Sequence, residues 1–221
     1  MTGCHERGPD VVMEQTGLGV AQCVSSTPSQ TALSTWVECC LIDGGSGQIR
    51  ISGMCQKALE ESASLAWQWV RLMTDTITQA LGFTIIQKLD VLPFNRDLLI
   101  HVSPGSAASW KSSSVGAAIA IAMVSLMIGV FPKQGVGVEG ELANQDGAMG
   151  EIGLLGDLKG FFDNMNEVQQ VTCLVVGRGT AKRLEMVAER HAVQVMGVKF
   201  LAESLPLCFP SAQESHGTRI S

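Results

Sequence analysis

The sequence has no stretch dense in lysine or arginine, and its formal net charge is -6 over 221 residues. Nucleic-acid binding normally depends on a basic patch that neutralises phosphates, so no nucleic-acid partner is predicted. Because the basic residues are scattered singly, there is also no polybasic patch for a membrane surface. With 46% apolar residues, the chain is long enough for one sizeable domain and too short for two.

The seven cysteines form no Cys-x-x-Cys pair, and their number is odd. A zinc site and a disulfide framework are both poorly supported, and no metal or other cofactor is predicted. Several cysteines lie in apolar runs such as residues 36–42, where a thiol behaves as a small hydrophobe. The first ten residues lack the apolar core of a secretory signal. These features favour a reducing, intracellular compartment.

The sequence contains no Gly-x-x-x-x-Gly-Lys-(Ser/Thr) phosphate-binding loop, so this polypeptide is not predicted to bind ATP. Its long apolar run, residues 115–131, is near the lower limit for crossing a bilayer and contains two glycines, a serine and many alanines. We interpret this run as a buried helix and keep a membrane span as the less favoured alternative.

Hydrophobic periodicity predicts one α+β domain, because hairpin patterns and βα units are mixed along the chain. Residues 43–47, Asp-Gly-Gly-Ser-Gly, predict a hairpin in an antiparallel sheet that opens the domain. Residues 1–16 are expected to be a disordered leader, residues 17–206 the domain and residues 207–221 a flexible tail. Strands are predicted at residues 20–24, 36–42, 48–52, 98–102, 136–142, 171–176 and 192–196, and helices at residues 59–73, 115–128, 158–168 and 181–191.

The segment Trp-Lys-Ser-Ser-Ser-Val-Gly-Ala-Ala, residues 110–118, directly precedes the most apolar predicted helix. A serine at a helix N-terminus lies beside unpaired backbone N–H groups and the positive end of the helix dipole, which can stabilise an oxyanion. Serine is also a preferred helix cap, and on spacing alone capping is the commoner role. Small residues follow, and they would allow close packing of this helix.

Residues 97–106, Asp-Leu-Leu-Ile-His-Val-Ser-Pro-Gly-Ser, followed by Ser-Ser-Val-Gly at 113–116, resemble a pattern of the Lon protease family. That pattern leads to Gly-Pro-Ser-Ala-Gly, whose serine is the nucleophile and falls on Ser114. Residues 140–142, Gly-Glu-Leu, resemble a further strand of the family, in which Glu141 would position the catalytic residues. The resemblance covers roughly residues 17–205 and is closest to the peroxisomal branch. It implies a single Lon-type proteolytic domain.

In the family a desolvated lysine takes the serine proton as general base. The best match to its motif is residues 150–161, Gly-Glu-Ile-Gly-Leu-Leu-Gly-Asp-Leu-Lys-Gly-Phe, which aligns Lys159 with the first lysine and Phe161 with the second, catalytic one. A register with one inserted residue would instead bring Lys159 near the catalytic position. Lys111 could also substitute as base, although an exposed lysine is mostly protonated at neutral pH.

Other positions also depart from the family pattern. Glu139 replaces a threonine, Lys111 replaces an acidic residue, and Ser-Ser at 112–113 replaces Gly-Pro. His101 matches a histidine near the family's active site, but a packing role is commoner for a lone histidine on a strand.

The resemblance implies a serine endopeptidase of the Ser-Lys dyad class, with Ser114 and Lys159 as catalytic residues. Its substrates would be unfolded or damaged proteins, and it would form a homo-oligomeric ring, with any ATP dependence supplied by a separate ATPase module. The alternative is a catalytically inactive Lon-fold module acting in assembly or regulation. The last four residues lack the Ser-Lys-Leu peroxisomal address, which leaves a peroxisomal or a cytoplasmic location undecided.

Overall fold

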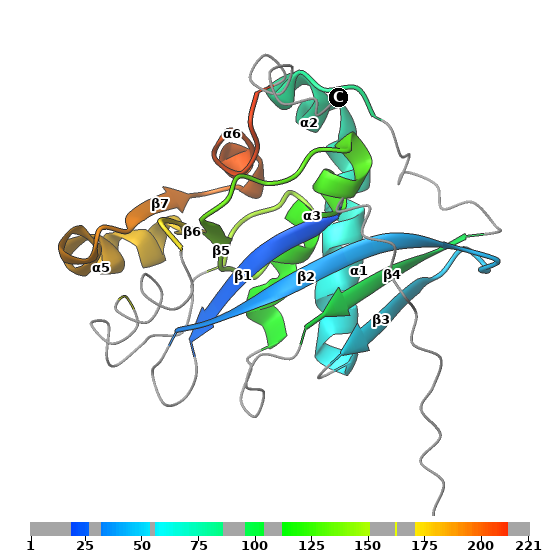
Figure 1. Cartoon of the computed structure of the whole chain (residues 1–221), viewed down its shortest axis with the longest axis horizontal. Helices are drawn as coiled ribbons and strands as arrows, with labels where there is room; N and C mark the ends of the chain where they lie inside the picture. The colour runs from blue at the N-terminus through cyan, green and yellow to red at the C-terminus, as the bar shows by residue number, and fades with distance from the viewer. Residues whose placement is uncertain are drawn as a thin grey trace, which may run out of the picture.

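The computed structural model describes residues 19–26, 32–53, 56–85, 96–103, 112–150, 162 and 171–211. They form one sheet of seven strands: β1 (Val20–Ser26), β2 (Ala32–Asp43), β3 (Ile49–Gly53), β4 (Arg96–Val102), β5 (Val136–Val138), β6 (Cys173–Gly177) and β7 (Gln194–Val198). The strand order is β3-β4-β2-β1-β5-β6-β7 (Figure 1). β2 pairs antiparallel with β1 and β4, and the other neighbours are parallel. The predicted α+β class is confirmed.

Helices pack on both faces of this sheet. The α-helices are α1 (Gln56–Leu72), α2 (Thr74–Leu81), α3 (Gly116–Ile128), α5 (Arg178–Ala188) and α6 (Leu205–Cys208), and the 3₁₀ turns are η1 (Ser112–Val115), η2 (Glu189–His191) and η3 (Leu201–Ser204). The helices predicted at residues 59–73, 115–128 and 181–191 are confirmed as α1, α3 and α5 with η2. The one predicted at residues 158–168 lies outside the described residues except for Phe162, and α2 and α6 were not predicted.

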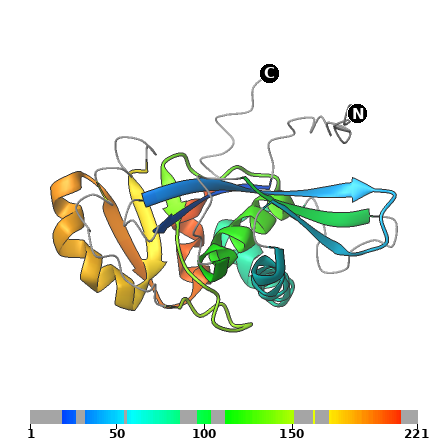
Figure 2. The same cartoon turned by 90° about the horizontal axis from the view of Figure 1, so that it is seen from below.

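The helix α3 is buried on every side, because it lies between α1 and the β1–β2 part of the sheet. All thirteen of its residues are buried. Figure 2 shows α1 and α3 together below the sheet. The one hydroxyl-bearing side chain of α3 is Ser125. It donates a hydrogen bond to the carbonyl of Val130 at 2.8 Å and accepts one from the N–H of Gly19 at 3.1 Å. In the part of the chain that the structure describes, no helix is long and apolar enough to cross a bilayer.

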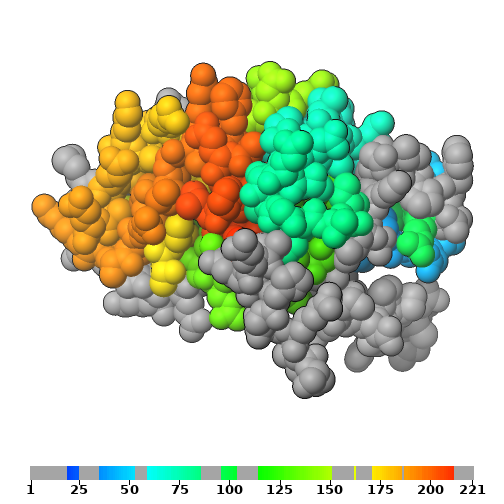
Figure 3. Space-filling model, turned by 90° about the horizontal axis from the view of Figure 1, so that it is seen from above, coloured from blue at the N-terminus to red at the C-terminus, as the bar shows by residue number. Residues whose placement is uncertain are grey.

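The helix α5 covers the part of the sheet that β6 and β7 form. Leu174 and Val176 of β6 pack with the apolar residues of α5, whereas Val175 belongs to the core cluster that contains α3. Because successive strand residues point to opposite faces, α5 and α3 lie on opposite faces of the sheet. α6 packs against α2, so segments far apart in the sequence lie side by side, as Figure 3 shows.

The predicted hairpin between β2 and β3 is wrong, because β4 lies between these two strands. A carboxylate of β4 organises the connection instead. Oδ1 of Asp97 accepts hydrogen bonds from the backbone N–H groups of Ser46 at 2.7 Å and Gln48 at 3.0 Å. Oδ2 of Asp97 forms an ion pair with Arg50. Residues 43–47 therefore wrap around an acidic side chain rather than closing a tight turn.

The environment of Asp97 favours its ionised form. The side chain is 1% exposed, and a Cβ atom at Gly45 would collide with it. The backbone N–H of Gln48, with smaller effects from Ser46 and Arg50, holds the pKa of Asp97 below its usual range, although burial acts in the opposite direction. A carboxylate that accepts several N–H bonds is stabilised in its charged form.

We expect Asp97→Asn to lower the melting temperature by several degrees at pH 7, because a neutral amide cannot accept these charge-assisted bonds. A carboxyl whose pKa is lower in the folded state stabilises that state fully above its unfolded-state pKa of about 3.9, and this contribution is lost as the pH falls through the folded-state pKa. Circular dichroism melts should therefore show a difference between wild type and variant that is constant above about pH 5 and shrinks below about pH 4.

Asp43→Asn is the matched control, because the Asp43 side chain is 79% exposed and bonds to Arg96 on the surface. Its melting temperature should change much less, since exposed ion pairs contribute little. An Asp97→Asn effect that persists unchanged at acid pH would contradict the proposed role of the charge.

Candidate active site

Ser114 lies in the 3₁₀ turn η1, which runs directly into α3. The structure thus places this serine at the start of the buried helix, as the sequence predicts. The residue at the N-cap position of α3 is Val115, so Ser114 is not the cap of that helix. Ser114 is 7% exposed. It lies at the end of α3 where backbone N–H groups lack partners within the helix and the dipole is positive.

Two hydrogen bonds hold the start of α3 against the residues that follow β5. The N–H of Gly140 donates to the carbonyl of Ser114 at 3.1 Å, and the N–H of Ala117 donates to the carbonyl of Gly140 at 3.1 Å. We call this pair of bonds the Gly140 clamp. It fixes the backbone of Ser114 to a segment 26 residues further along the chain.

The clamp explains why the predicted strand at residues 136–142 is too long. The structure ends β5 at Val138, because the next residues turn their backbone groups toward other partners. The N–H of Glu139 still donates to the carbonyl of Val175 in β6 at 2.9 Å, but Gly140 bonds to η1 and α3. Leu142 forms only an isolated bridge, with Met149.

Glu139 is a fully buried acid beside this site, with an exposed fraction of 0%. It adjoins Gly140 in the clamp, and so its backbone lies close to Ser114. Burial first, and the negative charge of Glu139 second, raise the pKa of the Cys23 thiol on β1. The sequence marks Glu139 only as a departure from threonine and gives no signal of its burial.

The segment that resembles the lysine motif begins next to the clamp. The N–H of Gly150 donates to the carbonyl of Glu141 at 2.8 Å, and a Cβ at Gly150 would lie 3.4 Å from Cβ of Glu141. The Glu141 side chain is exposed. Lys111, Lys159 and Phe161 lie outside the described residues.

The helix α1 closes the site from the other side. A Cβ at Gly116 would lie 3.7 Å from Cβ of Ser62 on α1 and 3.4 Å from the backbone nitrogen of Leu142. The predicted close packing at this small residue is therefore observed. A Cβ there would make ordinary van der Waals contacts, so a side chain larger than that of alanine would press on α1 and on the segment that follows the clamp.

A family model of the Lon protease (S16) C-terminal proteolytic domain matches residues 1–159, which is more than half of the chain. The chain belongs to the Lon protease family. The matched range includes Ser114 and the Gly140 clamp. A search among curated proteins found no match. The resemblance identified from the sequence motifs is confirmed at the level of the family, and the likeness to the peroxisomal branch stays a prediction.

In this Lon domain the His101 side chain on β4 forms a hydrogen bond with a neighbouring strand. Its Nδ1 lies 2.8 Å from Oγ of Ser52 on the neighbouring strand β3, and the residue is half-buried. Glu38 of β2 is its register partner on the other side. Cross-strand pairs of this kind stabilise a sheet, which agrees with the packing role that is commoner for such a histidine.

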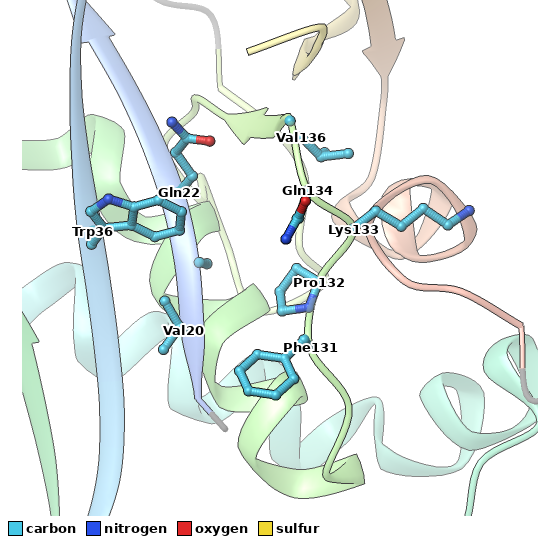
Figure 4. Close-up of a pocket in the computed structure, with 10 residues that line it drawn as sticks. Val20, Gln22, Trp36, Phe131, Pro132, Lys133, Gln134 and Val136 are labelled. Carbon is cyan, nitrogen blue, oxygen red and sulfur yellow. The ribbon is translucent and has the colours of Figure 1, made fainter. Parts of the chain in front are cut away.

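The Lon domain also has a cavity of about 450 Å³ between β1, β2 and residues 131–136. Figure 4 shows Trp36, Phe131 and Gln134 around this cavity, while the side chain of Lys133 points away from it. The Lys133 ammonium donates to the carbonyl of Pro206 at 3.2 Å. Ser114 is not among the residues that line this cavity. The cavity is therefore separate from the site at the start of α3.

The described cysteines form no disulfides, and three of the five are buried. Cys23, Cys39 and Cys208 are buried, whereas Cys40 and Cys173 are half-buried. Burial raises the pKa of Cys208 to about 12 and raises the pKa of Cys23 and Cys39 as well. Since the thiolate is the reactive form, these three thiols should be inert. No group of three potential metal ligands occurs among the residues that the structure describes.

In the native protein at pH 8, iodoacetamide should modify Cys40 and Cys173 at least tenfold faster than Cys23, Cys39 and Cys208. Solvent access determines the relative rates of modification, because the buried thiols contact the reagent only when the core opens. Peptide mass spectrometry over time measures each site. Unfolding in guanidinium should abolish the differences, and equal rates in the native state would contradict the observed burial.

Proposed function

We propose that this chain is a serine peptidase domain that hydrolyses peptide bonds with Ser114 as its nucleophile. The observation that supports this role is the position of Ser114 at the start of the buried helix α3, with its carbonyl held by the Gly140 clamp. A nucleophile on a rigid, packed element keeps the geometry that acyl transfer requires.

In the proposed reaction, Oγ of Ser114 attacks the substrate carbonyl carbon while its proton passes to a general base. The resulting oxyanion is stabilised by backbone N–H groups at the start of the helix. The N–H of Ala117 is already bonded to the carbonyl of Gly140, so the amides that remain for this role are those preceding Ala117. The base then protonates the leaving amine, and water hydrolyses the acyl-enzyme through the same groups.

We assign the role of base to Lys159, in the register with an inserted residue that brings it toward the catalytic position. Support comes from the start of its segment, because Gly150 bonds to Glu141 beside the Gly140 clamp. A lysine acts as base only when its surroundings lower its pKa, which desolvation achieves. The competing register, with Phe161 at the catalytic position, would leave the serine without this base.

Membership of the Lon family favours protein substrates, and we extend this to unfolded or damaged polypeptides as the expected class. Extended chains expose the peptide bond that a serine nucleophile must reach. We further propose a homo-oligomeric ring, and a separate ATPase module if the reaction depends on ATP, because both are features that the family resemblance implies. The cysteine pattern supports a reducing compartment.

A second candidate function is a catalytically silent Lon module that acts in assembly or regulation. The observation that favours it is the fully buried acid Glu139 next to the nucleophile position, where the family pattern has a threonine. A negative charge at this place opposes the charge that develops during acyl transfer. Phe161 in the position of the catalytic lysine would also prevent catalysis, because it leaves the serine without a general base.

Ser114→Ala should reduce cleavage of an unfolded fluorescent casein substrate to the background rate, because no other group can form the acyl-enzyme. Labelling by a fluorophosphonate probe should disappear in parallel. The control is Ser64→Ala, which removes an exposed hydroxyl from α1. If wild type neither cleaves nor reacts with the probe, the silent-module function replaces the peptidase; if Ser114→Ala matches an active wild type, Ser114 is not the nucleophile.

Lys159→Ala should slow the fluorophosphonate labelling of Ser114 by about 10²- to 10⁴-fold, the usual contribution of a general base. Lys182→Ala, which removes an exposed lysine from α5, should leave the rate unchanged. Labelling is followed by in-gel fluorescence with thermal melts of each variant. An unchanged rate in folded Lys159→Ala would assign the base to another residue.

A further inference from the structure

The cavity beside Trp36 has no role in the proposed peptidase reaction. Its volume of about 450 Å³ lies within the range of about 300–1,000 Å³ that is usual for ligand sites. One wall consists of β1 and β2, and the other consists of residues 131–136, which connect α3 to β5 (Figure 4). Most of the lining residues are apolar, which is also typical of sites that bind small molecules.

Two aromatic side chains line this cavity, one from each wall, and the rest of the protein covers each of them only in part. Trp36 of β2 is 48% exposed and Phe131 is 55% exposed. They are two of the four large apolar side chains that are exposed among the described residues. Apolar surface that is gathered at one concave place, rather than scattered singly, marks a binding site. An aromatic ligand between the two walls would remove apolar surface of both rings from water.

The strand β1 also presents backbone groups to the cavity. The carbonyl of Trp36 accepts a hydrogen bond at 3.0 Å from the N–H of Ser103, which follows β4 on the far side of β2 from β1. Trp36 therefore directs its backbone groups away from β1. Its register partner in β1 is Gln22, whose backbone groups consequently point toward β5. Val20, two residues earlier in the same strand, directs its N–H and C=O the same way.

The strand β5 does not take up these groups of Val20. The pairing of β1 with β5 begins at Gln22 and Gly137. In a continued ladder the N–H of Val136 would donate to the carbonyl of Val20, but it donates instead to the carbonyl of Lys133 at 3.4 Å. Within the strands that the structure describes, the ladder therefore stops short of Val20, which lines the cavity. A ligand with a hydrogen-bonding group at its edge would satisfy this backbone.

The charges around the cavity favour an uncharged ligand. Lys133 is the one charged residue among the described residues that line it. Its side chain points away from the cavity, and its ammonium donates to the carbonyl of Pro206 at 3.2 Å. A charged ligand would lose hydration in the cavity without gaining a partner of opposite charge, which is costly. A neutral ligand avoids this cost.

We propose that this cavity is a binding site for a compact, uncharged aromatic molecule with a hydrogen-bond donor or acceptor at its edge. Trp36 and Phe131 contact the ring of the ligand, and the backbone of Val20 bonds to its polar edge. The proposal does not rest on the peptidase function, because Ser114 does not line the cavity. A binding measurement therefore tests it without any assay of cleavage.

The test titrates the full chain with N-phenyl-1-naphthylamine, a neutral aromatic probe with one N–H whose fluorescence rises in apolar surroundings. Wild type should bind it saturably at a single class of site. Trp36→Ala and Phe131→Ala should each weaken binding by about tenfold, the order expected when an aromatic contact and its buried area are lost. Because both side chains are exposed, neither truncation should prevent folding, which thermal melts verify.

Leu72→Ala is the matched control, because it removes an exposed apolar side chain from α1 that does not line the cavity. Its affinity for the probe should equal that of wild type. A second probe, 1-anilinonaphthalene-8-sulfonate, has the same ring system with an added negative charge. Wild type should bind it more weakly than the neutral probe by about tenfold or more, because the cavity supplies no positive charge to the sulfonate.

The outcomes decide between a built site and unspecific adsorption of the probe. Binding that is weakened in Trp36→Ala and Phe131→Ala but not in Leu72→Ala supports the site. If folded wild type shows no saturable binding, or if all three variants lose affinity equally, the proposal is overturned. Equal affinities for the neutral and the charged probe would overturn the selection of an uncharged ligand. None of these results depends on Ser114, so the peptidase function stands or falls separately.

Discussion

The Gly140 clamp is the constraint on which the site depends. Its two hydrogen bonds join the turn of Ser114 and the first residues of α3 to the segment that follows β5. Without it, the start of α3 would lack its two backbone bonds to the segment that follows β5. The clamp also uses the amide of Ala117, which narrows the choice of oxyanion donors. The chemistry of the site thus follows from backbone bonds that carry no side-chain specificity.

Local sequence patterns predicted much of the fold. The features that they did not predict depend on contacts between residues far apart in the chain. The helical periodicity of its apolar residues predicts α1, and a continuous apolar run predicts α3. Each pattern lies within one segment of the sequence. The connection between β2 and β3 could not be read in this way. Its glycines are typical of a hairpin, but Asp97, some fifty residues away, takes the amides that a tight turn would have used. Strand order is a tertiary property that a turn signal does not determine.

In the candidate site, too, some features could be predicted from the sequence and others only from the fold. The position of Ser114 before a small-residue helix is visible in the sequence, as is the family resemblance. The burial of Glu139 is not, because acidic residues are almost never fully buried and the surrounding glycines carry no side-chain pattern. Its burial follows from the fold, in which the backbone of Glu139 bonds to Val175 of β6 in the interior of the sheet. The cavity beside Trp36 likewise arises from segments that meet only in the fold.

The pairing of β1 with β5 has a mechanical consequence. Only two residue pairs join these strands, Gln22 with Gly137 and Cys23 with Val138, whereas seven join β2 to β4. The pairing between β1 and β5, which we call the seam, therefore has few backbone bonds. Local opening will separate the two halves of the sheet at this seam more readily than at the β2–β4 pairing. Glu139 lies immediately beyond the seam, on the half that includes β6. Any shear along this line would strain the two bonds of the Gly140 clamp, because they join that half of the sheet to α3, which packs on β1 and β2.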